Sequence, residues 1–433
     1  MTGRDSKEQS RAFLALLLAF FVNFLGYAFI VPILPSWQTQ FSLNATQATL
    51  LVSLWAVPLF LLGPFTGRIS DRFGPGRTIF VSLLLLTGSS LLYIVATNEL
   101  VGRPFLLLAL ARLVHGASGA TVMTAGLAAA SQLWPTRFGE QAGKLLGIAA
   151  IGGLFGPVLG GLLFSWGEAS AFGVLAGLTL AVCPLMLVAS NDVGGPNASS
   201  AATVSIGVFF SDPILFRVGV LLAITTVATG ALEAGVPLFL DDTLGLSAAQ
   251  IGGVLLVMVL MQGIGSVIWG RLVDRRGPTR YMVIGWTFVV LSLIGVGLAG
   301  TLVTGTTAIL AMVALLGVFQ FSIAAAQIPM LPMIDTATNR ALGEGNPGLA
   351  FGVFGAAWAA GTILGPLTVG PVFDLFGSWA LALGGLALPA SAALLVTMMN
   401  REVLHECYEE EISKRKRNSA STGRSGQSVQ EED

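Results

Sequence analysis

Long apolar runs alternate with short polar segments along almost the whole chain. Twelve of these runs reach the length of about 20 residues that a helix needs to cross the hydrocarbon core of a bilayer. They lie at residues 12–34, 47–67, 78–97, 104–132, 142–166, 170–189, 214–240, 248–270, 281–300, 307–334, 350–373 and 378–399. The pattern predicts an all-α membrane protein with twelve transmembrane helices.

The interruptions between the runs divide the chain into two halves. Residues 190–213 are rich in Gly, Asn, Ser and Ala and form the predicted linker between two six-helix halves, 12–189 and 214–399. Residues 1–11 form a short polar N-terminus. Residues 400–433 alternate charged clusters with Ser and Gly, which bury too little apolar area to fold, so we expect a disordered tail.

Composition excludes several classes of protein. Only 10% of the residues are charged and 54% are hydrophobic, whereas soluble chains carry about 25% charged residues. The 54 glycines lie mainly within the apolar runs, where small residues let transmembrane helices approach closely. A net charge of −1 gives no indication of nucleic-acid binding, and two cysteines give no disulfide framework.

The positions of the basic residues predict the orientation in the membrane. With a cytoplasmic N-terminus, Arg103 alone of the 22 Lys and Arg residues lies in an outer loop and Arg112 lies within a run, while the other twenty lie in or beside cytoplasmic segments. We therefore expect both termini in the cytoplasm. The sequon at Asn44 then faces outward and is a possible glycosylation site, whereas the sequon at Asn197 lies in the cytoplasmic linker.

Two motifs recur at matching places in the halves. The segment GRISDRFGPGR at 67–77 repeats as GRLVDRRGPTR at 270–280, with seven identities at an offset of 203. The shared or chemically active positions are Gly67, Arg68, Asp71, Arg72, Gly74 and Arg77, and Gly270, Arg271, Asp274, Arg275, Gly277 and Arg280. Their Arg and Asp side chains predict a cytoplasmic latch that breaks when the halves rock; a plain positive-inside anchor does not explain the repeated aspartate.

A second repeat lies in the fifth and eleventh runs, at an offset of 209. It comprises Gly152, Gly156, Pro157, Gly160 and Gly161, matched by Gly361, Gly365 and Pro366. Glycines at this spacing form a flat helix face, and proline removes a helix hydrogen bond, so we expect close packing between the halves rather than ligand contact.

These motifs resemble those of the major facilitator superfamily. The loop at 67–77 looks like the signature loop of that superfamily, Arg112 to Ala120 in the fourth run resembles its second motif, and the fifth-run motif is similar to that of twelve-span drug:proton antiporters. The resemblance implies the MFS fold, two six-helix pseudo-repeats with a binding site between them, and alternating access.

A closer likeness is to the vesicular amine transporter family, carried by the segments FIVPILP, GALEAGVPLFL and PMLPMIDTATNR. The chain departs from that family at three positions. Asn23 and Gly355 replace aspartates of the first and eleventh spans, and Trp55 replaces a lysine of the second. These changes put amine specificity in doubt.

Glu233 is the best candidate for the proton-coupling or cation-binding acid. It lies roughly 10 Å below the outer end of the seventh run by the helical rise, and a charge within a span is by default a functional hypothesis. The alternative is a carboxylate held by a local structural partner.

Other polar residues within the runs are candidates for the same site. Arg112 can hold backbone carbonyls of an opposing helix or pair with Glu233, and His115 can relay protons or serve as a packing histidine. Asn23, and Gln320 with Gln327 seven residues on, can orient a substrate or bond between helices. Trp55, with Tyr27 and Trp358, can supply aromatic walls or core packing.

The sequence shows no Walker loop, no metal-ligand spacing and no nucleophile–base arrangement, so we expect neither an enzyme nor a cofactor. The leading hypothesis is a monomeric secondary transporter in the plasma, vacuolar or vesicular membrane, with protons, a small organic molecule and the lipid bilayer as its partners and no nucleic acid. It would export or sequester that molecule by proton antiport. The alternatives are a uniporter or proton symporter for a metabolite, and a membrane sensor or receptor that has lost transport.

Overall fold

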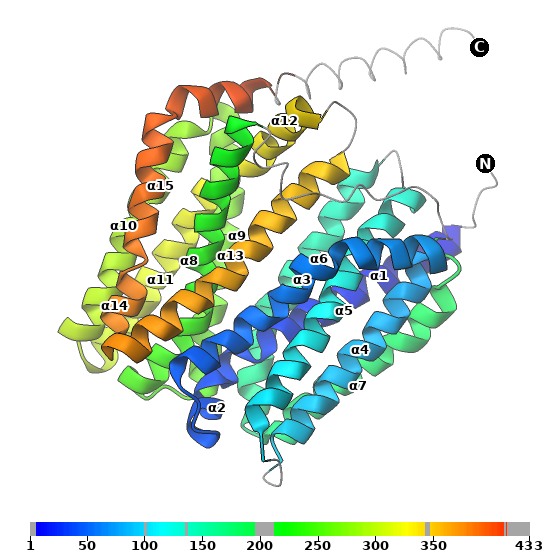
Figure 1. The fold of residues 1–433 in the computed structure, drawn as a ribbon, viewed down its shortest axis with the longest axis horizontal. Helices are drawn as coiled ribbons and strands as arrows, with labels where there is room; N and C mark the ends of the chain where they lie inside the picture. The colour runs from blue at the N-terminus through cyan, green and yellow to red at the C-terminus, as the bar shows by residue number, and fades with distance from the viewer. Residues whose placement is uncertain are drawn as a thin grey trace.

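The computed structural model describes residues 6–98, 102–134, 137–194, 212–342, 347–410 and 413, and the regular structure of these ranges is helical (Figure 1). Twelve helical segments are long and apolar enough to cross a membrane. The prediction of an all-α protein with twelve membrane spans is confirmed.

The spans of the two halves follow one another along the chain. The first half contains α1 (Ser6–Phe29), η1 (Val31–Ile33), α2 (Leu34–Gln40), α3 (Ala45–Phe73), α4 (Pro75–Ala96), α5 (Pro104–Leu133), α6 (Phe138–Phe164) and α7 (Glu168–Ala189). The second contains α8 (Pro213–Leu244), α9 (Ala248–Arg276), α10 (Thr279–Leu302), α11 (Gly305–Gln327), α12 (Met330–Leu342), α13 (Pro347–Phe376), α14 (Trp379–Gly384) and α15 (Ala387–Met399).

Three of the predicted spans are interrupted. The first breaks at η1, which contains Pro32 and precedes Pro35, and the tenth breaks between α11 and α12 next to Pro329. Proline removes a backbone donor and clashes with the preceding turn, which accounts for these two breaks. The twelfth span is divided between α14 and α15.

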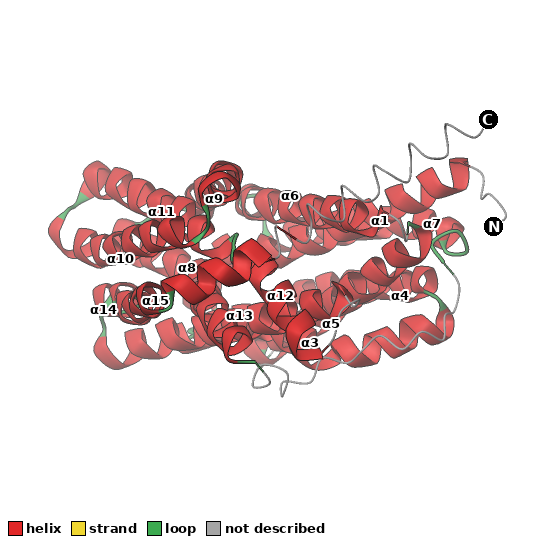
Figure 2. Cartoon of the chain, turned by 90° about the horizontal axis from the view of Figure 1, so that it is seen from above, coloured by secondary structure: helices red, strands yellow, loops and turns green. Residues whose placement is uncertain are grey.

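The halves form two helix bundles side by side, α1–α7 in blue to cyan and α8–α15 in green to red (Figure 1), and the view from above shows the same division (Figure 2). Ser6 and the helix that reaches Glu410 lie at one end of the bundles, called here the terminal end. The opposite end, where α3 begins and α13 finishes, is called the far end.

The second span of each half begins and ends in the same way. Both α3 and α9 have 29 residues, and each starts with a capping box, Asn44 with Gln47 in α3 and Ser247 with Gln250 in α9. In both boxes the side chains satisfy backbone donors that a helix N-terminus leaves free. The two boxes are 203 residues apart, so the repeat extends beyond the signature loop.

Both spans also end at a position whose backbone conformation favours glycine. Gly74 has a φ of 87° and Gly277 a φ of 81°, in the region that L side chains rarely adopt. At each turn the chain packs against the segment that follows the last span of its half: Gly76 lies against the backbone of Ser190, and Gly277 lies against the ring of His405.

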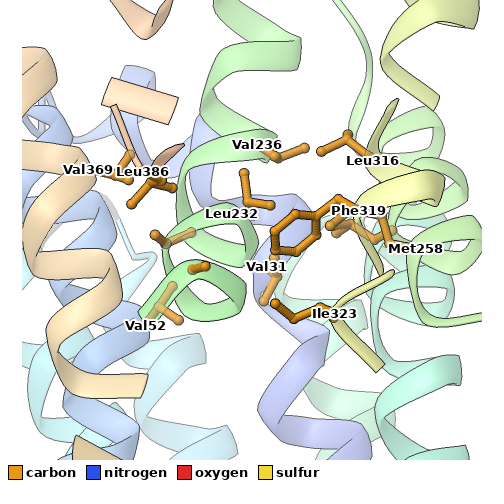
Figure 3. Close-up of a cluster of buried hydrophobic side chains, with 14 of the residues drawn as sticks. Val31, Val52, Leu232, Val236, Met258, Leu316, Phe319, Ile323, Val369 and Leu386 are labelled. Atoms are coloured by element: carbon orange, nitrogen blue, oxygen red, sulfur yellow. The ribbon is translucent and has the colours of Figure 1, made fainter. Parts of the chain in front are cut away.

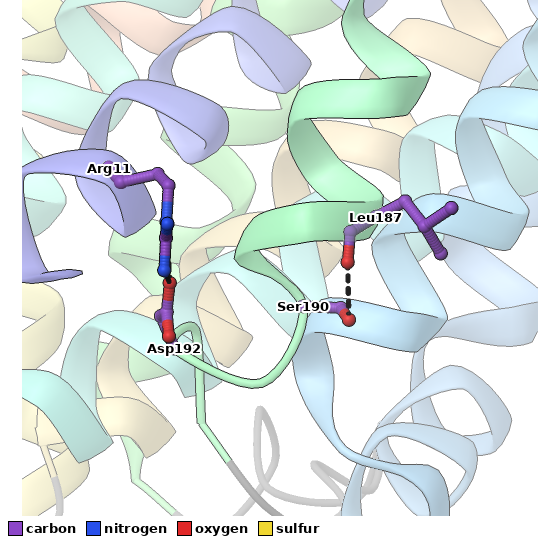
Figure 4. A network of polar contacts seen from close by, with 4 residues as sticks. All are labelled: Arg11, Leu187, Ser190 and Asp192. Atoms are coloured by element: carbon purple, nitrogen blue, oxygen red, sulfur yellow. Dashed lines mark hydrogen bonds and ion pairs between the residues drawn. The ribbon is translucent and has the colours of Figure 1, made fainter.

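The segments after the last spans are fixed differently in the two halves. In the first half Arg11 forms an ion pair with Asp192, next to the Ser190 hydroxyl that donates to the Leu187 carbonyl (Figure 4). In the second half the Tyr408 hydroxyl donates to Asp274 at 3.0 Å.

The structure corrects part of the predicted disordered tail. Residues 401–410 are helical, and Leu404, Cys407 and Tyr408 are buried because they pack onto the second half. These three apolar positions were hidden among charges in the sequence. Residues 411–412 and 414–433 lie outside the described residues, as does 195–211 of the predicted linker.

The span 5 and span 11 glycines make close helix contacts, mostly within one half rather than between the halves. A Cβ at Gly152, Gly156 or Gly160 would meet the backbone of α1, and a Cβ at Gly361 or Gly365 would meet α8. The expectation of packing between the halves is thus wrong for these five positions and correct for Gly161, which faces Ala248 at the start of α9.

Contacts between the halves concentrate toward the far end. Gly161 of α6 lies against α9, and Gly370 of α13 lies against Ala45 and Thr46 at the start of α3. Between these crossings lies an apolar cluster drawn from both halves, with Val31 and Val52 of the first half facing side chains of the second (Figure 3). The second half contributes Leu232, Val236, Met258, Leu316, Phe319, Ile323, Val369 and Leu386. Toward the terminal end, a further cluster is made of first-half residues alone.

Candidate functional site

The carboxylate of Glu233 lies at the junction of the two halves. Glu233 belongs to α8 and is partly buried, and the hydroxyl of Tyr27, from α1 of the other half, donates to its Oε2 at 2.8 Å. The two residues are 206 positions apart in the chain. Their contact joins the first spans of the two halves at membrane depth.

Arg112 of α5 lies behind Tyr27 and is fully buried. Its Nε donates to the Leu51 carbonyl at 2.8 Å, its Nη1 donates to the Tyr27 carbonyl at 3.2 Å, and its guanidinium lies 5.5 Å from the centre of the Tyr27 ring. Of the two predicted roles for Arg112, the structure shows the bonds to backbone carbonyls. No ion pair joins it to Glu233 in the part of the chain described, because Tyr27 lies between them.

A second set of buried hydrogen bonds, which involves His115 and Asn23, lies in the first half beside Tyr27. The His115 Nε2 lies 3.1 Å from the Asn23 carbonyl, and the Asn23 amide donates to the Ser118 hydroxyl at 2.9 Å. Ser118 in turn donates to the Ser82 carbonyl at 2.7 Å. Spans 1, 3 and 4 are therefore joined by buried polar bonds beside the candidate acid.

Trp55 of α3 forms the aromatic wall of this site. Its ring centroid lies 4.0 Å from that of Tyr27 and 5.9 Å from that of Phe24. Trp358 of α13 approaches it from the other half, with centroids 6.3 Å apart and planes at 85°. The predicted aromatic residues do lie together, on both sides of the junction.

Several buried polar atoms at this site have no hydrogen-bond partner among the described residues. They are Oδ1 of Asn23, Nε1 of Trp55, Nδ1 of His115 and Nη2 of Arg112. Leaving a buried polar group unsatisfied costs about 1–3 kcal/mol. A Cβ at Gly119 would lie 3.2 Å from the Asn23 oxygen and 3.1 Å from the Trp55 ring, so a glycine keeps that place open.

Gln320 and Gln327 do not join this group. Gln320 is buried with an unpartnered Oε1, and Gln327 is the last residue of α11 and partly exposed. Within the described ranges, neither forms a hydrogen bond with Glu233 or Tyr27.

A surface pocket of about 220 Å³ lies at the far end of the second half, lined by Asp242, Phe373 and Trp379 among others, and includes none of the predicted site residues.

The predicted latch residues lie at the terminal end and are not paired with one another. The ion pairs among the described residues include none of them. Arg72 lies over the ring of Phe73, and Asp274 accepts from Tyr408. The described ranges also contain no group of three His, Cys, Asp or Glu residues arranged to hold a metal ion.

Two repeated six-helix bundles that meet around a partly buried carboxylate define a helical membrane transporter of the two-half type. The sequence comparison agrees: residues 16–366 match the Major Facilitator Superfamily, and the chain belongs to that family.

Individual relatives are similar to this chain at low identity. Multidrug resistance protein 2 of Bacillus subtilis is 25% identical over 291 residues, covering 64% of this chain and 70% of the relative. The human MFS-type transporter SLC18B1 is 26% identical over 381 residues, covering 84% and 80%. The solved structure of a bacterial homologue of the human lysosomal transporter Spinster, in an inward-facing and unoccupied conformation, shares the fold with a TM-score of 0.68 at 15% identity, covering 94% and 98%.

Sequence reasoning placed Tyr27 only as an aromatic wall and missed its bond to Glu233. The repeat gives a usable signal. Val31-Pro32 in span 1 recurs as Val236-Pro237 in span 7 at an offset of 205, and this offset places Glu233 opposite Ala28, next to Tyr27. Asp374 was missed as well. Asp374 lies in the last turn of α13, where a negative charge interacts unfavourably with the dipole of its own helix. A carboxylate in such a position indicates that it binds another helix.

Proposed function

We propose that this chain is a secondary transporter that exchanges protons for a small organic compound, and that Glu233 carries the proton. The observation that supports this most directly is the position of the Glu233 carboxylate. It lies at membrane depth where the two halves meet, and it bonds to the opposite half through Tyr27. An acid in that position can sense both the proton and the arrangement of the halves.

The relatives support the exchange of an organic compound. One relative is named a multidrug resistance protein and another an MFS-type transporter. The span 5 glycine–proline motif, which resembles that of drug:proton antiporters, favours antiport over uniport or symport. Intact signature loops in both halves favour transport over a sensor that has lost it.

The positive-inside distribution supports a cytoplasmic terminal end. With that orientation, we propose that the contacts between the halves near the far end close the extracellular or lumenal side, so that this state faces the cytoplasm. The absence of ion pairs among the described latch residues fits this state, because we propose that Arg68, Asp71 and their counterparts pair when the terminal end closes. Asn44, at the far end, would then face outward and stays a candidate glycosylation site.

The direct test uses purified protein in proteoliposomes with an imposed pH gradient and a panel of cationic, neutral and anionic solutes. Glu233→Gln keeps the size and hydrogen-bonding capacity of the side chain but removes its titration. We expect gradient-driven transport to be lost, while exchange of substrate for substrate without a gradient persists, because only proton coupling is lost.

The matched control is Glu140→Gln, which changes an exposed carboxylate paired with Lys144 at the start of α6. Surface pairs of this kind contribute about 0–1 kcal/mol, so its transport should match the wild type. If Glu233→Gln transports against a gradient as well as Glu140→Gln does, Glu233 is not the coupling acid. Wild-type flux that ignores the gradient would identify a uniporter instead.

A further inference from the structure

The bond between Tyr27 and Glu233 differs in kind from the other polar contacts between the halves. At the far end Asp374 accepts from the start of α3, and further along α3 the Ser53 hydroxyl donates to the Ile363 carbonyl at 2.8 Å. Among the described residues, the Tyr27–Glu233 bond is the one between-half hydrogen bond at membrane depth that contains a titratable acid. A change of protonation there acts on the junction itself.

The strength of this bond depends on the charge of Glu233. The phenol donates its proton, and an ionised carboxylate accepts it in a charge-assisted bond roughly twice as strong as a neutral one. When Glu233 takes up a proton it loses that charge, while Tyr27 keeps its own proton throughout. The ionised acid therefore holds α1 and α8 together, and the neutral acid holds them less firmly.

Tyr27 is fixed in the orientation that this bond needs. Its ring lies against Trp55 with centroids 4.0 Å apart, and its carbonyl accepts from Arg112 at 3.2 Å. The Arg112 guanidinium lies 5.5 Å from the centre of the same ring and adds a positive charge beside Tyr27. A hydrogen-bond donor in contact with the carboxylate and a positive charge beside that donor both suit an ionised Glu233.

No other charge competes with them from the helices packed against α8. Tyr27 from α1 contacts Glu233 directly, and Arg112 from α5 is the nearest charge, on the far side of Tyr27. Segments η1, α2, α11, α14 and α15 contain no Asp, Glu, Lys, Arg or His. The other helices packed against α8 carry charged residues only at their ends. Asp374 of α13 lies at the far end. At the terminal end lie Arg68, Asp71 and Arg72 of α3, Arg271 and 274–276 of α9, and Asp335 and Arg340 of α12.

We propose that Tyr27 is the positioning residue that couples the proton on Glu233 to the contact between the two halves. This inference rests on Glu233 as the proton carrier. The arrangement with α1 and α8 joined favours the ionised acid, so by reciprocity proton binding favours an arrangement in which they part. Tyr27 thereby converts protonation into a shift between the states of the transporter.

The test measures the relative arrangement of the two halves rather than the transport of a substrate. Spin labels at Ser131 and Glu402, exposed at the terminal end of opposite halves, report the separation of that end by pulsed electron resonance as the pH is varied, with both buried cysteines replaced by alanine. In the wild type, lower pH should shift the population toward short distances. In Tyr27→Phe the midpoint should move up by about 1 pH unit, the size of shift expected for one favourable partner of a carboxylate.

Tyr281→Phe is the matched control, because it removes a phenol from a buried site in the second half that does not face Glu233. An unchanged midpoint in Tyr27→Phe, equal to that of Tyr281→Phe, would overturn the proposal and leave Tyr27 a packing residue. Should Tyr27→Phe fail to insert, Glu233→Asp withdraws the carboxylate from the phenol and should raise the midpoint likewise; no shift there also overturns the proposal.

Glu233→Gln separates this inference from the proposed function. If its distances still respond to pH, another acid carries the proton, and the proposed function fails at Glu233. If its distances ignore pH while Tyr27→Phe leaves the wild-type midpoint intact, Glu233 is the proton carrier and the positioning role of Tyr27 alone is refuted.

Discussion

Two helix crossings close the far end of the molecule, and they are related by the internal repeat. In one, Gly161 of α6 lies against Ala248 at the start of α9; in the other, Gly370 of α13 lies against Ala45 at the start of α3. The two glycines are 209 residues apart and the two alanines 203, the offsets of the sequence motifs. The repeat thus determines where the halves touch each other as well as how each half folds.

The polar bonds at these crossings are not repeated. At the α13–α3 crossing Asp374 accepts from the backbone of Ala45 at 3.0 Å and of Thr46 at 2.9 Å. Its counterpart at the offset of 209 is Ser165, whose hydroxyl donates to the Leu162 carbonyl of its own helix at 2.6 Å. Glu233 likewise has no acidic counterpart in span 1. The packing follows the symmetry of the repeat, and the charges depart from it.

The largest effect should come from breaking the packing that both crossings share. An alanine at Gly370 or Gly161 would force its Cβ into the backbone at the start of α3 or α9. Overpacking of this kind costs about 1–3 kcal/mol, and 1.4 kcal/mol is tenfold in an equilibrium. Both variants should shift the state population about 10-fold or more away from the far-end-closed arrangement, read as shorter Ser131–Glu402 label distances.

Gly153→Ala is the control, because its added Cβ meets nothing within 4 Å although Gly153 lies on the same helix as Gly161. Similar shifts for Gly370→Ala and Gly161→Ala would support two equivalent crossings. A shift in one variant alone would show that a single crossing determines the closure of the far end.

The sequence predicted the twelve spans and the two repeated halves of the fold. Apolar runs located all twelve spans, and the motif repeat located the two halves, because both are properties of local sequence. The break at η1 and the ordered helix 401–410 were missed. The first depends on where prolines fall within an apolar run, and the second on three buried residues among charges.

The sequence could single out candidate site residues one by one but could not predict how they are arranged. Burial cost within a membrane singled out Glu233 and Arg112; the structure places Glu233 at the junction and Arg112 within the first half, bonded to the Tyr27 carbonyl. Their shared partner Tyr27 could not be derived, since a contact across 206 residues requires knowing how the halves pack. The same limit applies to Asp374, whose partners begin a helix of the other half.

A medium effect should follow from removing the charge at one crossing. Asp374→Asn keeps the shape of the side chain but takes a negative charge from the positive N-terminus of α3, where such a charge contributes about 0.3–1 kcal/mol. We expect the ratio of far-end-closed to far-end-open molecules to fall about 2- to 5-fold in the same label measurement. Asp241→Asn, an exposed residue near the end of α8, should leave the population unchanged. Equal distances in both variants would mean that the cap does not contribute to closure.

The smallest effect should come from adding the missing charge to the other crossing. Ser165→Asp introduces a carboxylate at the repeat-related position, near the start of α9, where the first backbone donors of a helix have no intrahelical partner. The carboxylate gives up the local bond to Leu162, so the gain should stay below that of the native cap, about twofold toward the far-end-closed arrangement. In the double variant with Asp374→Asn it should restore part of the lost closure. No restoration would show that α6 and α9 do not place position 165 as α13 and α3 place Asp374, and that the symmetry of the crossings ends at the glycines.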